Sequence, residues 1–140
     1  MCPCPGPQES LEKQLVRALA EQKQKEPDVL WVNMEEKAYR SLSLGVKMDL
    51  FVVRRDSIEV YEARKRRSQA LDLYQLRMYW DGCAIDGRPV TSAILAAPSH
   101  PNEVEALVRT FNDSYRDPTG QPYHFSLLTW GEVGIDLKAV

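Results

Sequence analysis

The sequence of 140 residues lacks long apolar runs, is poor in cysteine and contains two histidines. No apolar stretch approaches the roughly 18 residues of a membrane-spanning helix, so we expect no transmembrane segment. The N-terminal stretch Met1–Pro7 has neither a basic region nor an apolar segment, which argues against a signal peptide. We expect residues 1–8 to form a disordered tail and residues 9–140 to form one domain.

The three cysteines are too few and too unevenly placed for a disulfide framework. Cys2 and Cys4 lie in the predicted tail, whereas Cys83 is far along the chain. A structural zinc site would need a second pair of ligands and a wider spacing than Cys2-Pro3-Cys4 offers. The cysteine usage therefore favours a reducing cytoplasm.

The formal net charge of −2 gives the chain no overall attraction for nucleic acid. The basic residues nevertheless cluster in one part of the sequence, where they are Arg54, Arg55, Arg64, Lys65, Arg66 and Arg67. A local basic patch can bind phosphate groups even on a weakly acidic protein. The alternative for Arg66 and Arg67 is that they are solvated loop charges.

Three segments have the apolar spacing of amphipathic helices, namely 10–25, 69–80 and a third that Pro101 opens. Ser10 and Ser68 are the expected N-caps of the first two helices. Gly82 is expected to end the second helix.

Five segments have the pattern of strands, and they are 40–44, 47–54, 58–64, 91–97 and 123–130. The apolar stretch 29–32 is compatible with a short strand or with a further helical turn. The resulting order is α, β, β, β, α, β, α, β. This order predicts an α/β fold with a mixed central sheet flanked by helices.

Two carboxylates lie on neighbouring predicted strands. Asp49 interrupts an apolar run, and Glu62 shares its strand face with Ile58 and Val60. An unpaired carboxylate is costly to bury, so each needs a compensating cation. One hypothesis is that they are structural partners of Arg54 or Arg40. The other is that both bind one divalent metal ion.

Magnesium suits two such carboxylates, because it prefers oxygen ligands and keeps several waters. A bound ion polarises a phosphodiester and lowers the pKa of a bound water, which generates a nucleophile. A nearby cation then stabilises charge on the phosphate. Arginine binds phosphate well but, unlike lysine, cannot exchange a proton at neutral pH.

The second predicted helix carries a polar stripe on an otherwise apolar surface. Its members are spaced three or four residues apart, and they are Gln69, Asp72, Gln75 and Tyr79. The opposite side carries Leu73, Leu76 and Trp80. The stripe is typical of a cleft wall that faces the end of a sheet, and the alternative is a solvent-facing stripe.

Three ordered segments resemble the motifs of the PD-(D/E)xK nuclease superfamily. They are Gly45–Leu50, then Glu62-Ala63-Arg64, then Gln75–Tyr79, and the last is similar to the Gln-x-x-x-Tyr helix of the RecB-like branch. The resemblance covers roughly residues 10–97. It implies a restriction-endonuclease-like αβββαβ core and Mg²⁺-dependent (or Mn²⁺-dependent) hydrolysis of phosphodiesters in DNA.

The resemblance also implies a set of metal ligands. Asp49 and Glu62 would hold the ion, and Ala63 would add its backbone carbonyl. An acidic residue of the first helix often joins such sites, and here Glu12 or Glu9 is available.

The remaining motif positions include one departure from the family. Arg64 stands where the family has lysine, and Lys65 is expected to point to the other strand face. Lys47 or Lys65 would substitute only if the backbone bulged. The resemblance implies that Arg64 or Lys65 contacts the scissile phosphate, and that Gln75 and Tyr79 support the site or contact DNA.

The leading functional hypothesis is thus a Mg²⁺-dependent, nuclease-like phosphodiesterase domain acting on DNA, with a site that Arg64 alters. The alternative is a catalytically inactive module of the same fold that binds nucleic acid or a protein partner. A protein partner or a second copy of the chain is compatible with either hypothesis, and a membrane is not expected.

Overall fold

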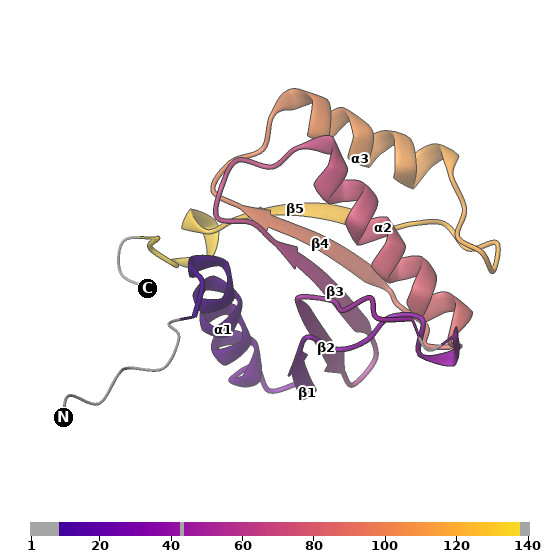
Figure 1. Cartoon of the computed structure of the whole chain (residues 1–140), viewed down its shortest axis with the longest axis horizontal. Coiled ribbons are helices and arrows are strands. Elements are labelled where there is room, and N and C mark those ends of the chain that lie inside the picture. The colour runs from indigo at the N-terminus through magenta and orange to yellow at the C-terminus, as the bar shows by residue number, and fades with distance from the viewer. Residues whose placement is uncertain (1–8, 43, 138–140) are drawn as a thin grey trace.

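The computed structural model describes residues 9–42 and 44–137, which form a central sheet with helices on both faces (Figure 1). The predicted tail, residues 1–8, lies outside the described residues. Within the described ranges, no helix has the length and apolar character that crossing a bilayer requires.

The sheet has five strands in the order β1-β2-β3-β4-β5. Their bounds are β1 Val29–Met34, β2 Leu50–Arg54, β3 Ile58–Ala63, β4 Ser92–Ala97 and β5 Phe125–Thr129. The pairs β1–β2 and β2–β3 are antiparallel, whereas β3–β4 and β4–β5 are parallel. A short turn suffices for the β2–β3 hairpin, and a helix crosses over between each parallel pair.

Three helices cover the sheet, with bounds α1 Leu11–Gln24, α2 Ala70–Ile85 and α3 Asn102–Ser114. Two short 3₁₀ turns, η1 Arg40–Leu42 and η2 Gly131–Val133, lie in the connections. Helix α1 lies on one face of the sheet, and α2 and α3 lie side by side on the other (Figure 1).

The buried apolar residues form two clusters, one on each face of the sheet. On the α1 side Leu15 packs with Tyr61, and on the α2 side Leu73 packs with Val60 and Phe111. Neighbouring residues of β3 therefore belong to opposite clusters, as the alternation of strand side chains requires. The same alternation turns Glu62 toward the side of Val60 and α2.

The predicted element order and the α/β class are confirmed, but one predicted strand is wrong. Residues 40–42 form η1, and the third antiparallel strand is β1, which contains the ambiguous stretch 29–32. Tyr39 has a φ of 56°, which breaks an extended course just before η1. Two backbone amides of η1 then donate to Asp86, 45 and 46 residues away, so distant hydrogen bonds override the local alternation.

The N-terminal end of α2 also differs from the prediction. The helix begins after Gln69, which is the N-cap in place of Ser68. Ser68 is buried, and its Oγ lies 2.7 Å from His100 Nδ1, so its hydroxyl serves a contact between loops.

Gly82 does not end α2, which continues to Ile85. A Cβ on Gly82 would lie 2.6 Å from the Tyr39 ring, closer than real Cβ contacts come. The glycine therefore permits close packing of the η1 loop against the helix.

Candidate functional site

Asp49 and Glu62 meet at one end of the β2–β3 hairpin. Asp49 immediately precedes β2 and Glu62 is the penultimate residue of β3, and the register pairs Leu50 with Tyr61 between them. Asp49 Oδ2 accepts a hydrogen bond of 2.8 Å from the Ala63 amide, and the two carboxyl groups interact directly. The structure therefore brings the predicted pair together.

Glu62 is the most deeply buried acid of the site, with 1% of its side chain exposed. Its Oε2 is buried and has no hydrogen-bond partner among the described residues. Burial, and then the charge of Asp49, raise the pKa of Glu62 to about 8, although Tyr79 and Arg64 favour the ionised form. Burial also raises the pKa of Asp49, against the opposing effect of the Ala63 amide. The pair is therefore short of positive charge.

Arg64, one residue past β3, turns its guanidinium onto the expected metal ligands. Its Nη1 lies 3.1 Å from the Ala63 carbonyl oxygen and forms an ion pair with Glu62 Oε1. The same nitrogen is 3.9 Å from Glu12 Oε2. One guanidinium nitrogen thus faces three of the four groups to which the resemblance assigns the ion.

The other nitrogens of Arg64 are bound by α2. Its Nε donates to Asp72 Oδ1 at 2.8 Å, and its Nη2 donates to Gln75 Oε1. The Arg64 carbonyl accepts a bond of 2.8 Å from Trp130 Nε1, which fixes the backbone at this point. Arg64 is therefore held by contacts on both its side chain and its main chain.

Asp72 is a central residue of the site that the predicted set of site residues does not contain. It is buried and also pairs with Arg66, whose Nη1 lies 2.9 Å from Asp72 Oδ2. Burial raises the pKa of Asp72, but hydrogen bonds from Arg66 and Arg64 outweigh that effect and lower it. The available signal was an acid in the first turn of a helix that follows four consecutive basic residues.

Three members of the polar stripe, Asp72, Gln75 and Tyr79, face the site, whereas Gln69 is exposed to solvent. Tyr79 is 5% exposed and interacts with Glu62, and burial followed by the charge of Glu62 raises the Tyr79 pKa. The exposed residues of the helix are instead largely apolar, and they include Leu71, Tyr74 and Met78.

Three predicted or alternative site residues lie elsewhere. Lys65 and Lys47 are exposed, and Lys47 forms a backbone bridge with Lys37. Neither lysine takes the family position, which Arg64 fills. Glu9 pairs with Arg17, so Glu12 is the acid of the first helix that joins the site.

The hypothesis of structural pairing with Arg54 or Arg40 is wrong for Asp49 and Glu62. Arg54 lies at the far end of β2, where it binds three other acids, namely Glu26, Asp28 and Glu59. Arg40 approaches Glu36 at 3.9 Å.

The donor set fits a hard divalent cation. No group of three or more His, Cys, Asp or Glu side chains forms a metal cage within the described ranges. Two carboxylates and a backbone carbonyl nevertheless offer oxygen alone, and magnesium completes such a set with water. The unpartnered Glu62 Oε2 is an open acceptor at this position.

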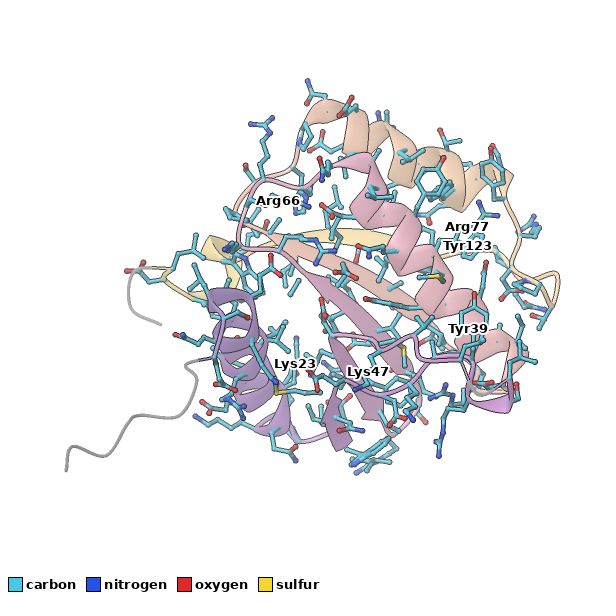
Figure 2. All side chains as sticks on the ribbon, in the orientation of Figure 1. Lys23, Tyr39, Lys47, Arg66, Arg77 and Tyr123 are labelled. Carbon is cyan, nitrogen blue, oxygen red and sulfur yellow. The ribbon has the colours of Figure 1, made fainter. Side chains whose placement is uncertain are left out.

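A basic loop adjoins these acids. Lys65, Arg66 and Arg67 follow Arg64 and are exposed. Figure 2 shows Arg66 on the loop that leads from β3 to α2. Cations that can meet an anionic ligand therefore lie beside the acidic pair.

Neither a protein-family model nor a curated protein sequence matches the chain. Solved structures do match. A repair endonuclease from Pyrococcus abyssi has a TM-score of 0.58 and 19% identity, over 90% of this chain and 50% of that one. EndoMS in its complex with double-stranded DNA has a TM-score of 0.55 and 17% identity, over 88% of this chain and 47% of that one.

EndoMS in apo form gives a TM-score of 0.51 and 19% identity, over 86% of this chain and 48% of that one. The chain therefore spans about half the length of the structures that it matches. At these identities the likeness concerns the fold. Together with the element order, it confirms the predicted restriction-endonuclease-like α/β fold of this chain.

Proposed function

We propose that the chain is a metal-dependent phosphodiesterase domain that acts on DNA, with its centre at Asp49 and Glu62. The observation that carries the proposal is the buried, unpartnered Oε2 of Glu62 beside a second carboxyl group. Nothing in the apolar core requires two acids at this place, and burying them without a full counter-charge is costly. A divalent ion would supply that charge.

Each residue of the proposed site has a separate role. Asp49, Glu62 and the Ala63 carbonyl would hold the ion, and Glu62 must lose its proton to do so. A bound Mg²⁺ or Mn²⁺ supplies Lewis acidity and a water of lowered pKa. Arg64 would bind a phosphate oxygen once its Nη1 leaves Glu62, because a guanidinium binds phosphate through paired N–H groups.

DNA is the proposed substrate because of the loop between β3 and α2. Its exposed cations Lys65, Arg66 and Arg67 directly follow the site on the chain, where they would hold the phosphates beside the scissile one. One of the similar structures, EndoMS, was solved with double-stranded DNA. This chain covers 47% of that structure.

The first test is metal binding, which thermal denaturation measures as a change in melting temperature. We expect Mn²⁺ or Mg²⁺ to raise the melting temperature of the wild type but not that of Asp49→Ala. Glu105→Ala, which removes an exposed acid from α3, is the control and should keep the metal response. No metal response in the wild type would refute the metal site.

The second test is cleavage of plasmid and linear DNA in the presence of the metal. Activity that Glu62→Ala abolishes, and that Glu105→Ala retains, would support the proposal. Activity that survives in Glu62→Ala would belong to a contaminant or to another site.

A catalytically inactive DNA-binding module is the second candidate, and one observation favours it. The Arg64 guanidinium already contacts Glu62 and the Ala63 carbonyl, so part of the site is neutralised without an ion. DNA binding that needs no metal, with no cleavage under any metal condition, would select this candidate.

A further inference from the structure

We propose that Arg64 is a built-in cation that occupies the metal ligand set when no ion is bound. The ion then enters only as the guanidinium leaves Glu62 and the Ala63 carbonyl. This inference rests on the proposed function, because it describes how the same site exchanges an internal charge for an external one.

A single nitrogen of Arg64 lies against two oxygens of the proposed metal site. Nη1 of a guanidinium carries two hydrogens, and here it faces the Ala63 carbonyl oxygen at 3.1 Å and Glu62 Oε1. The Ala63 carbonyl oxygen is a proposed ligand of the ion, and Oε1 belongs to the carboxylate whose open Oε2 would bind it. An ion bound to the same oxygens and the Nη1 group exclude each other, because both are cations that need the same space.

Arg64 has another anionic partner when it withdraws. Its Nε is bound to Asp72, and Asp72 also accepts a hydrogen bond of 2.9 Å from the Gln69 amide at the start of α2. The partner is therefore fixed by the helix end and does not depend on the ion. Arg64 can give up the Glu62 contact while its charge stays compensated.

The backbone of Arg64 restricts the exchange to the side chain. The Arg64 amide donates to the Ala96 carbonyl at 2.8 Å, and the Arg64 carbonyl accepts from Trp130. Both bonds tie this residue to the strand β4 and to the chain after β5. A rotation about the side-chain bonds is the change that the surroundings permit.

Arginine suits this role better than lysine does. Its planar fork reaches Glu62, Asp72 and Gln75 at the same time, whereas an ammonium is a single compact charge. The departure from the family motif thus has a physical consequence. The domain should keep its site together without metal, and it should bind the ion more weakly than a variant without the internal cation.

The experiment is calorimetric titration of the protein with Mn²⁺ at pH 8.5, where the proton on Glu62 competes least. We expect Arg64→Gln to bind Mn²⁺ at least ~10-fold more tightly than the wild type, because no guanidinium has to be displaced. In the presence of a chelator, the same variant should melt at a lower temperature than the wild type. An Mn²⁺ affinity of Arg64→Gln equal to or below that of the wild type would overturn the proposal.

The matched control is Arg66→Gln. It removes a guanidinium from the same Asp72 but makes no contact with the ligand oxygens, so its Mn²⁺ affinity should equal that of the wild type. A gain in Arg66→Gln as large as that in Arg64→Gln would reduce the effect to net charge and overturn the proposal.

Arg64→Lys and the wild type keep the proposal testable if Arg64→Gln does not fold. Arg64→Lys should bind Mn²⁺ more tightly than the wild type, and an affinity that is not tighter counts against the built-in cation. In the wild type, the Arg64 guanidinium protons should exchange faster by NMR when Mg²⁺ is added. Unchanged exchange at saturating Mg²⁺ would also overturn the proposal.

Failure of this proposal can be told from failure of the proposed function. Tighter Mn²⁺ binding in Arg64→Gln with no DNA cleavage by any variant keeps the built-in cation and refutes the phosphodiesterase. Metal-dependent cleavage by the wild type with unchanged Mn²⁺ affinity in Arg64→Gln gives the reverse result.

Discussion

Two buried carboxyl groups contact different parts of α2, and their surroundings differ. Glu62 faces Tyr79 of the helix, with 1% of its side chain exposed, and Asp86 caps the C-terminal end with 5% exposed. Burial raises the pKa of both. At Asp86 the hydrogen bonds of Ser41, Arg40 and Arg88 outweigh burial and hold the pKa far below its usual range, whereas the pKa of Glu62 rises to about 8.

The difference lies in what each carboxyl group has to bind. Asp86 accepts hydrogen bonds from two amides, a hydroxyl and a guanidinium, and its function is to hold η1 against the helix end. Glu62 has a second acid beside it and one oxygen without a partner. A saturated carboxylate of this kind stabilises a fold, whereas an unsaturated pair is typical of a site that awaits a ligand.

Asp86→Ala should have the largest effect on stability. The substitution removes the acceptor for the η1 amides and one of the acceptors of Arg88, and we expect a loss of ~3–4 kcal/mol in the free energy of unfolding. Urea denaturation followed by circular dichroism would measure it. Glu62→Gln should not lose stability at pH 8, because glutamine resembles the protonated acid. A larger loss in Glu62→Gln than in Asp86→Ala would contradict the comparison.

The hydrogen bonds between Asp86 and η1 also show why part of the fold was not predictable from the sequence. Alternation in Arg40-Ser-Leu satisfies a strand template, but the segment is bent by contacts with a residue more than 40 positions away. Ser68 has the residue type of an N-cap, but its hydroxyl is hydrogen-bonded to His100, which is 32 residues away in the sequence. Elements with strong local periodicity, such as β3 and α3, needed no distant information and were predicted well.

The stability of the wild type should fall as the pH rises from about 5 to 8. The ordinary pKa of a glutamate is 4.5 and that of folded Glu62 is about 8, so the folded state keeps a proton that the unfolded state releases in this window. The stabilisation is complete below 4.5 and is lost above 8. We expect a decrease of ~3 kcal/mol in the free energy of unfolding between pH 5.5 and 8.5.

Glu62→Gln isolates that effect, because it has no proton to lose. Chemical denaturation at a series of pH values should give a flatter profile for this variant than for the wild type. Asp86 provides the opposite check, since its lowered pKa adds stability above about pH 4 that changes little between 5.5 and 8.5. Parallel profiles for the wild type and Glu62→Gln would show that Glu62 does not hold the proton.

The position of the candidate site was predictable from the sequence, but the arrangement of its side chains was not. The spacing of Asp49, Glu62, Gln75 and Tyr79 was enough to predict that they meet, because strand and helix periods fix which face each one takes. The orientation of Arg64 and the part played by Asp72 were not predictable. They depend on how α2 is placed over the end of β3, which no local pattern specifies.

Metal stabilisation should be larger at pH 8.5 than at pH 6. At the lower pH the ion has to displace the proton of Glu62, whose pKa is about 8, so the increase in melting temperature should shrink. We expect Mn²⁺ to add ~5 °C at pH 8.5 and ~2 °C or less at pH 6. Differential scanning fluorimetry with Asp86→Asn as the control separates a site effect from a general one. An equal increase at both pH values would argue against competition between metal and proton.

Charge reversals near the two ends of α2 should affect DNA binding differently, and we expect this effect to be the smallest of the series. Lys65 and Arg67 are exposed in the loop that joins β3 to the start of α2, and Arg40 is an exposed cation beside Asp86 at the other end of the helix. If phosphates bind at this loop, the double variant Lys65→Glu, Arg67→Glu should weaken DNA binding ~5-fold. It should also reduce the salt dependence of binding, because a complex with fewer phosphate contacts releases fewer counterions when it forms. Arg40→Glu reverses a charge at the other end and should leave both quantities unchanged. Fluorescence anisotropy over a salt series distinguishes these outcomes. A general charge effect would weaken DNA binding in both variants, whereas a local effect would weaken it in the Lys65→Glu, Arg67→Glu variant alone.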